Sequence, residues 1–117
     1  MTTSRPDHNT ADVQAVASAR EQRRRAAAVY NAAADTYDAA ENAFWRRFGR
    51  RTIERLPLEP GMRVLDVCAG SGASVIPAAT AVGPSGCVLA IDAARDLLSL
   101  VPRKARAEGL GNIHIAA

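Results

Sequence analysis

The sequence has few of the residues that hold metal sites or disulfide-bonded domains together: two cysteines and two histidines among 117 residues. Cys68 ends one apolar run and Cys87 begins the next. In neighbouring parallel strands these positions lie at opposite ends of the sheet, farther apart than the roughly 7 Å between Cα atoms that a disulfide allows. His8 and His114 are isolated, so no metal-site spacing is present. We expect two free, buried thiols, no metal, and a cytoplasmic location.

Aromatic residues are also scarce, at 4% of the chain, and no apolar run is long enough to span a bilayer or to act as a signal peptide. Alanine accounts for 25 of the hydrophobic residues. Each alanine buries little surface, because burial stabilises by roughly 0.8 kcal/mol per CH2 group. We therefore expect one small domain with a thin core and low stability in isolation.

Acidic residues are fewer than basic ones, which leaves a net charge of +3. Arginine supplies most of the positive charge, in three runs at residues 20–25, 45–51 and 102–106. Such runs can bind phosphate, and a basic nucleic-acid-binding protein remains an alternative. We favour solvated helix faces, since most charge runs of this kind are surface features.

The chain divides into three parts by composition. Residues 1–10 are polar and lack a helix cap, so we expect a disordered tail. Residues 11–58 have good helix propensity and should form an N-terminal helical region, with helices at about 11–29 and 39–56. Residues 59–117 alternate short apolar runs with helical segments, which is typical of an α/β domain.

Three short apolar runs predict strands at residues 63–68, 87–92 and 112–116. Helical segments at about 75–82 and 94–108 separate them. This alternation favours a parallel sheet with right-handed crossovers.

Local signals set the ends of these helices. Ser74 is a candidate N-cap, which would place Pro77 in the first turn of the helix, where proline is tolerated. Pro102 falls inside the second crossover helix and should kink or split it. Gly109 is the expected cap at its end.

The stretch VLDVCAGSG, residues 64–72, combines a strand with a carboxylate, Asp66, and a glycine turn, Gly70 to Gly72. In doubly wound sheets, ligands lie beyond the carboxyl ends of the strands, and glycine lets a ligand lie against bare backbone. A second acid, Asp92, ends the next strand 20 residues after Gly72, where such folds place the acid that binds ribose hydroxyls. A purely structural turn is the alternative.

The residues of the turn narrow the ligand class. No Gly-Lys-Ser/Thr ending of a phosphate-binding loop is present, and Val75 stands where a dinucleotide fingerprint has its third glycine. Asp66 would repel phosphate but attract an ammonium group. A ligand with ribose, an amino group and no phosphate fits better, and S-adenosylmethionine is such a ligand.

Residues 30–117 resemble the N-terminal half of a class I S-adenosylmethionine-dependent methyltransferase, most closely the small-molecule branch with the ubiquinone/menaquinone C-methyltransferases. PGMRVLDVCAGSG is similar to the first motif of that family and VGPSGCVLAIDAARDLL to its second strand region. AEGLGNIHIAA is similar to the approach to its third strand, and YNAAADTYDAAENAFWRR to its leading helices. The resemblance implies a Rossmann-like parallel sheet, limited to the first three strands and preceded by N-terminal helices.

The same resemblance implies roles for individual residues. Asp66 would lie near the amino group of the methionine moiety, and Asp92 would accept hydrogen bonds from both ribose hydroxyls, with Ala93 beside the adenine. Tyr37 would cover the cofactor, or else pack between helices. The backbone around the methionine moiety would come from Cys68, Ala69, Gly70, Ser71 and Gly72. Cys68 stands where many relatives have glycine, and we expect it to fill space without acting as a nucleophile.

Family members continue past the third strand with an acid near the adenine and four more strands, whereas this sequence ends at Ala117. The substrate pocket and any general base would belong to that further part, and no acid–base pair here replaces it. The chain could be a truncated methyltransferase of a small-molecule acceptor, a short relative completed by a partner chain, or a non-catalytic nucleotide-binding half-domain. In the family's strand order the first strand would form an open apolar edge, so we expect self-association or a partner chain there.

Overall fold

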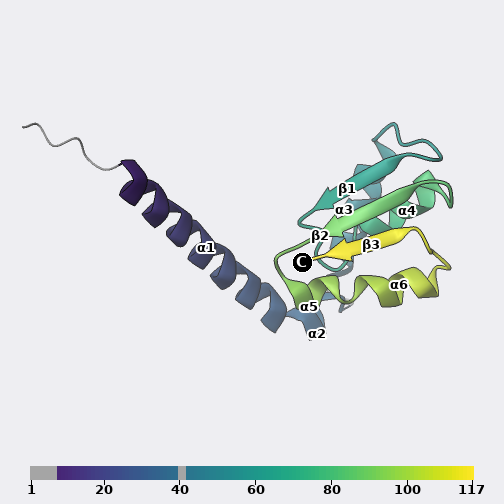
Figure 1. Cartoon of the computed structure of the whole chain (residues 1–117). Coiled ribbons are helices and arrows are strands. Elements are labelled where there is room, and N and C mark those ends of the chain that lie inside the picture. The colour runs from purple at the N-terminus through teal and green to yellow at the C-terminus, as the bar shows by residue number, and fades with distance from the viewer. Residues whose placement is uncertain (1–7, 40–41) are drawn as a thin grey trace, which may run out of the picture.

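The computed structural model describes residues 8–39 and 42–117, and Figure 1 shows the whole chain. Three N-terminal helices precede an α/β unit. The elements in chain order are α1 (His8–Ala32), α2 (Ala34–Tyr37), α3 (Ala43–Glu54), β1 (Arg63–Val67), α4 (Val75–Val82), β2 (Cys87–Ile91), α5 (Arg95–Leu98), α6 (Val101–Ala107) and β3 (Ile113–Ala116).

The three strands form one parallel sheet in the order β1-β2-β3. Leu65 pairs with Leu89, which pairs in turn with His114. The predicted strands and the edge position of the first strand are confirmed. Among the described residues, the outer edge of β1 has no strand beside it.

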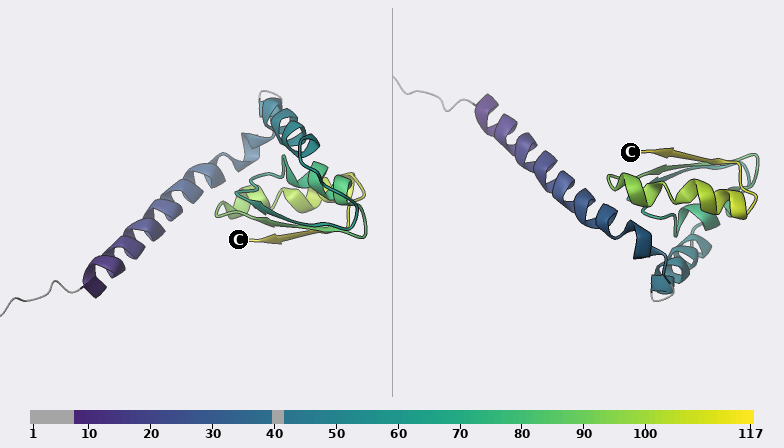
Figure 2. Two further views of the ribbon diagram at one scale, coloured as in Figure 1. Left: turned by 90° about the horizontal axis from the view of Figure 1, so that it is seen from above. Right: turned by 90° about the horizontal axis from the view of Figure 1, so that it is seen from below.

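Helices cover only one face of this sheet. Val75, Ala79 and Val82 of α4 are fully buried against Val88 of β2, and Val101 of α6 joins them in the same cluster. Figure 2 shows the helices on one side of the strands and open space on the other. Many of the buried residues are alanines or valines, so the predicted thin core is confirmed.

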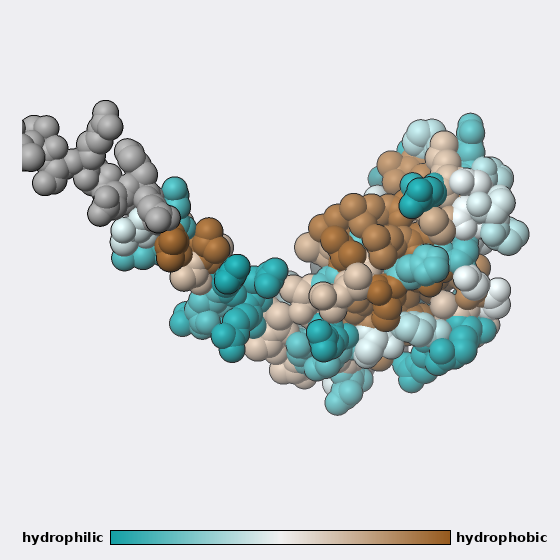
Figure 3. All heavy atoms as spheres, viewed as in Figure 1, coloured by the Kyte–Doolittle hydropathy of each residue, from teal (hydrophilic) through white to brown (hydrophobic). Residues whose placement is uncertain are grey.

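The opposite face of the sheet is apolar and exposed. Leu65 and Val67 are 59% and 60% exposed, and Leu89, the partner of Leu65 in the next strand, is 41% exposed. Alternate residues of a strand point to opposite faces, so these three side chains lie on the face without helices. Figure 3 shows the apolar surface over the strands in the view of Figure 1.

Local signals place the helix ends as predicted. Ser74 precedes α4, and Pro77 is its third residue. The second crossover helix is split into α5 and α6, with Pro102 in the first turn of α6. After α6 the chain turns at Gly109, which has a φ of 68° and donates its N–H to the Arg106 carbonyl.

The N-terminal helices differ from the prediction. α1 begins at His8, so residues 8–10 of the predicted disordered tail are helical, and residues 1–7 lie outside the described residues. Once a helix has nucleated, each added residue gains a backbone hydrogen bond for a small loss of conformational entropy. α1 therefore extends beyond its alanine-rich part to His8. The helix predicted at 39–56 is shorter, at Ala43–Glu54, because Asn42 donates from its backbone N–H to the Ala39 carbonyl in a turn.

α1 extends away from the α/β unit and contacts it only near its last residues (Figure 1). There, Asn31 Oδ1 accepts the N–H of Asp96 at 3.0 Å. α3 instead packs closely on the start of α4. A Cβ at Gly49 would lie 2.3 Å from the Ala73 carbonyl oxygen, so only glycine allows this approach. No helix within the described ranges is long and apolar enough to cross a membrane.

Candidate functional site

The turn after β1 and the end of β2 meet at the carboxyl edge of the sheet. The two oxygens of Asp92 accept the backbone N–H groups of Gly70 and Ala94, each at 2.7 Å. A carboxylate oxygen has two lone pairs, so both oxygens can still accept from a ligand. The contact with Gly70 brings the acid after the second strand and the glycine turn together.

Gly70 and Gly72 have positive φ angles, of 54° and 92°, in different surroundings. No heavy atom lies within 4 Å of the place where a Cβ of Gly70 would stand, so the backbone there is open. A Cβ at Gly72 would lie 3.1 Å from Cγ2 of Val101, so this glycine serves close packing on α6. The open position is therefore Gly70, beside the carboxylate of Asp92.

Asp66 lies on β1 and is half-buried toward α4. Its Oδ2 accepts the hydroxyl of Ser74 at 2.5 Å. Ser74 stands at the N-cap position, as predicted, but its side chain holds Asp66 and makes no cap hydrogen bond to the helix backbone. This contact fixes the carboxylate beneath the glycine turn.

Cys68 and Ala69 lead from β1 into the turn. Cys68 has a φ of 60°, the only positive φ among the described residues other than glycine, and its thiol is free but exposed. Cys87 is also free and is half-buried. The prediction of two buried thiols was wrong: Cys68 is exposed where its left-handed backbone turns the chain out of the sheet, and Cys87 is only half-buried. Ala69 is buried, and its N–H bonds the Ile91 carbonyl of β2.

Tyr37, at the end of α2, belongs to the same region. Burial is the main cause that raises the pKa of Tyr37 above its ordinary value of 10.0, and Tyr30, Asp92 and Asp38 raise it further. Asp38, the next residue, accepts the hydroxyl of Ser71, which keeps Tyr37 close to the glycine turn. The Tyr37 ring stacks on Trp45, with centroids 6.5 Å apart and planes 10° from parallel.

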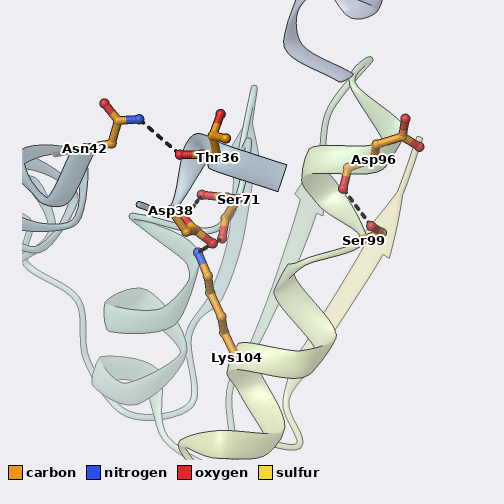
Figure 4. A network of polar contacts seen from close by, with 7 residues as sticks. All are labelled: Thr36, Asp38, Asn42, Ser71, Asp96, Ser99 and Lys104. Atoms are coloured by element: carbon orange, nitrogen blue, oxygen red, sulfur yellow. Dashed lines mark hydrogen bonds and ion pairs between the residues drawn. The ribbon is translucent and has the colours of Figure 1, made fainter. Parts of the chain in front are cut away.

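A polar network that the sequence did not predict ties α2 to the glycine turn (Figure 4). Ser71 Oγ donates to Asp38 Oδ1 at 2.8 Å, and Lys104 Nζ lies 2.6 Å from Asp38 Oδ2. Lys104 also donates to the Ser71 carbonyl at 2.7 Å. The only sequence signal was the resemblance of the stretch that contains Tyr37 and Asp38 to the leading helices of the family.

The predicted residues thus gather at one edge of the sheet, with the exposed Ala93 next to Asp92. In the part of the chain that the structure describes, no three metal-binding side chains come together.

A hollow of about 710 Å³ lies between α3, α4 and α6 and borders the glycine turn at Gly72. Arg46, Arg47, Arg50 and Lys104 line it. Arg50 lies 3.6 Å from Glu54, and Lys104 pairs with Asp38, so two of the four cations already have acidic partners. The carboxylates of Asp66 and Asp92 are not among the residues that line this hollow.

Comparison with known proteins gives the family. A family model described as protein-L-isoaspartate(D-aspartate) O-methyltransferase (PCMT) matches residues 27–117. Nocamycin O-methyltransferase of Saccharothrix syringae is 37% identical over 87 residues, which are 74% of this chain and 31% of that protein. Demethylmenaquinone methyltransferase of Geobacillus kaustophilus is 38% identical over 63 residues, which are 54% of this chain and 27% of that protein.

Solved structures agree on the fold. A SAM-dependent methyltransferase from Aquifex aeolicus superposes with a TM-score of 0.59 and 24% identity, over 74% of this chain and 45% of that one. A SAM-dependent O-methyltransferase from Thermotoga maritima superposes with a TM-score of 0.54 and 28% identity, over 59% and 26%. The chain spans less than half the length of each of these relatives. The chain belongs to the methyltransferase family that the PCMT model describes, and its helices and parallel sheet have the Rossmann-like fold of class I methyltransferases.

Proposed function

We propose that this chain forms the cofactor-binding part of an S-adenosylmethionine-dependent methyltransferase that acts on a small molecule. The observation that carries the proposal is the carboxylate of Asp92 beside the open backbone of Gly70. An acid at the end of the second strand, next to a glycine turn, suits a ribose with two free hydroxyls. Family membership and the named activities of the relatives support the same reading.

The residues at this edge fit the chemical groups of S-adenosylmethionine. Asp92 accepts from the ribose hydroxyls, and Ala93 lies beside the adenine. Asp66 attracts the ammonium group of the methionine moiety through its opposite charge. Its Oδ1 remains available as an acceptor while Ser74 donates to Oδ2. Tyr37 covers the cofactor from α2. The remaining contacts are those of the backbone from Cys68 through Gly72.

Bound S-adenosylmethionine supplies a methyl group on a positively charged sulfur. What the protein adds is position, because methyl transfer depends on holding the acceptor atom in line with that group. The described residues hold the cofactor, and we assign acceptor binding to the additional length that the relatives have. Free thiols at Cys68 and Cys87 suit the reducing cytoplasm, where we place the protein.

The open side of the sheet offers a surface to further polypeptide. Leu65, Val67 and Leu89 form an exposed apolar face, and β1 leaves a row of backbone N–H and C=O groups unpaired at its outer edge. Such an edge recruits another strand. We propose that further polypeptide, or another copy of this chain, pairs with β1 and covers this face.

Calorimetric titration with three ligands tests the proposed function. S-adenosylmethionine, NADH and ATP all contain an adenosine, but only NADH and ATP carry phosphate groups. Binding of S-adenosylmethionine alone is expected, because Asp66 attracts its ammonium group and repels phosphate. Preference for NADH or ATP, or no binding to any of the three at millimolar concentration, would overturn the proposal.

A further inference from the structure

Three residues from separate parts of the chain meet beside the glycine turn. Asp38 follows α2, Ser71 lies within the turn, and Lys104 is in α6. Ser71 stands 33 residues from each of the other two in the sequence. The network is closed, since each residue contacts both others: Ser71 Oγ to Asp38, Lys104 to Asp38, and Lys104 to the Ser71 carbonyl. Figure 4 shows the three side chains converging.

The ion pair in this network differs from the other pairs in the described chain. The side chains of Lys104 and Asp38 are 22% and 26% exposed. The pair of Arg25 with Glu21 is 79% and 52% exposed and joins two turns of one helix. Exposed pairs of that kind contribute little, whereas breaking a sequestered pair leaves a poorly solvated charge behind. The Asp38–Lys104 pair therefore constrains the structure where the surface pairs do not.

These contacts join a helix of four residues, α2, to the glycine turn. α2 has one buried residue, Ala34, which packs on Ala94 and Leu97. Its other end is held by Asp38, the residue directly after Tyr37. The position of Tyr37 thus depends on where the carboxylate of Asp38 is anchored.

The same contacts fix the orientation of Ser71. Its hydroxyl donates to Asp38 and its carbonyl accepts from Lys104, so both polar groups are directed into the network. Ser71 is 6% exposed. Held from both sides, it fixes the turn in the form that leaves Gly70 open next to Asp92.

We propose that Asp38, Ser71 and Lys104 form a latch that positions Tyr37 and the glycine turn together for the cofactor. Asp38 and Lys104 are positioning residues: they act through Tyr37 and the turn and do not touch the ligand. The effect on cofactor affinity rests on the proposed function, while the effect on α2 does not.

Substitutions in the full chain test the latch. Lys104→Met removes the cation and Asp38→Asn the anion, and Lys104→Arg keeps a donor for both partners. Arg103→Met, which removes an exposed cation from the same helix, is the matched control. Ser71→Ala deletes only the hydroxyl and serves if a charge variant fails to fold.

Two readouts separate positioning from general stability. The first is the fluorescence of Trp45, the single tryptophan, which stacks on Tyr37 and reports its position without any ligand. The second is the affinity for S-adenosylmethionine. We expect Lys104→Met and Asp38→Asn to change the Trp45 emission and to weaken binding about tenfold each. The double variant should be no weaker than either single one, because both break the same contact. Lys104→Arg should restore binding to within about threefold of wild type.

Losses equal to that of Arg103→Met, unchanged Trp45 emission, or additive losses in the double variant would overturn the latch. A wild-type chain that does not bind S-adenosylmethionine would overturn the proposed function instead. In that case Trp45 emission and hydrogen exchange of residues 34–38 test the latch without ligand. Hydrogen exchange should be faster in Lys104→Met and unchanged in Arg103→Met.

Discussion

Asp92 accepts a hydrogen bond from the backbone N–H of Gly70 at 2.7 Å, and this contact joins the end of β2 to the turn that follows β1. The same carboxylate holds the N–H of Ala94 at the start of the next segment. One side chain therefore shapes the turn and also presents the oxygens that we assign to the ribose.

Asp92→Ala should weaken S-adenosylmethionine binding by roughly 1.5–3 kcal/mol, the value of hydrogen bonds to a charged acceptor. Calorimetry measures the change. Asp96→Ala, an exposed acid four residues later, is the control and should bind as wild type does. Equal affinity of wild type and Asp92→Ala would remove Asp92 from the site.

Gly70→Ala should weaken binding strongly, because its Cβ would occupy the open space beside Asp92. Gly109→Ala is a matched control: Gly109 also has a positive φ and no heavy atom within 4 Å of its Cβ position, but it lies at the end of α6. Both variants should lose about 1–2 kcal/mol of stability from left-handed strain. Denaturant unfolding and titration together distinguish them, and similar binding by the two would mean that the turn at Gly70 is only structural.

The phenol of Tyr37 should titrate above pH 10.0, since burial and neighbouring groups raise its pKa. A raised pKa in the folded state means that the folded protein holds this proton more tightly than the unfolded chain does. The resulting stabilisation is complete below the pKa of the unfolded state and is lost as the pH rises through the pKa of the folded state. Stability should therefore fall as the pH rises above about 10, and less so in Tyr37→Phe. Denaturant unfolding at several alkaline pH values measures this. The same pH dependence in both proteins would contradict the burial of Tyr37.

The exposed face of the sheet should make the isolated chain self-associate. Leu65→Lys places a charge on that face and should lower the association measured by analytical ultracentrifugation over a range of concentrations. Val13→Lys, at an equally exposed position on α1, should not. A wild-type chain that stays monomeric at high concentration would show that this face does not bind a second copy of the chain.

Much of the α/β unit follows from local signals. The strands were predicted to within about one residue, because short apolar runs between glycine and proline turns are read over a few positions. The split before α6 followed from Pro102, and the meeting of Asp92 with the glycine turn followed from the parallel sheet.

Features set by distant contacts could not be predicted in this way. Nothing near Asp38 in the sequence indicates Lys104 as its partner, since only the folded chain brings the residue after α2 beside α6. Ser74 was a reasonable helix cap, but a carboxylate on the neighbouring strand takes its hydroxyl. Cys68 was expected to be buried as part of an apolar strand, and its positive φ exposes it.

The cofactor site is tested most directly by amide chemical-shift changes in the labelled chain on titration with S-adenosylhomocysteine, which lacks the reactive methyl group. The amides of residues 68–72 and of Asp92 and Ala93 should shift most, and those of α1 before Asn31 should not move. Shifts centred on the hollow lined by Arg46 and Arg50, or no shifts at saturating ligand, would contradict a cofactor site at the carboxyl edge of the sheet.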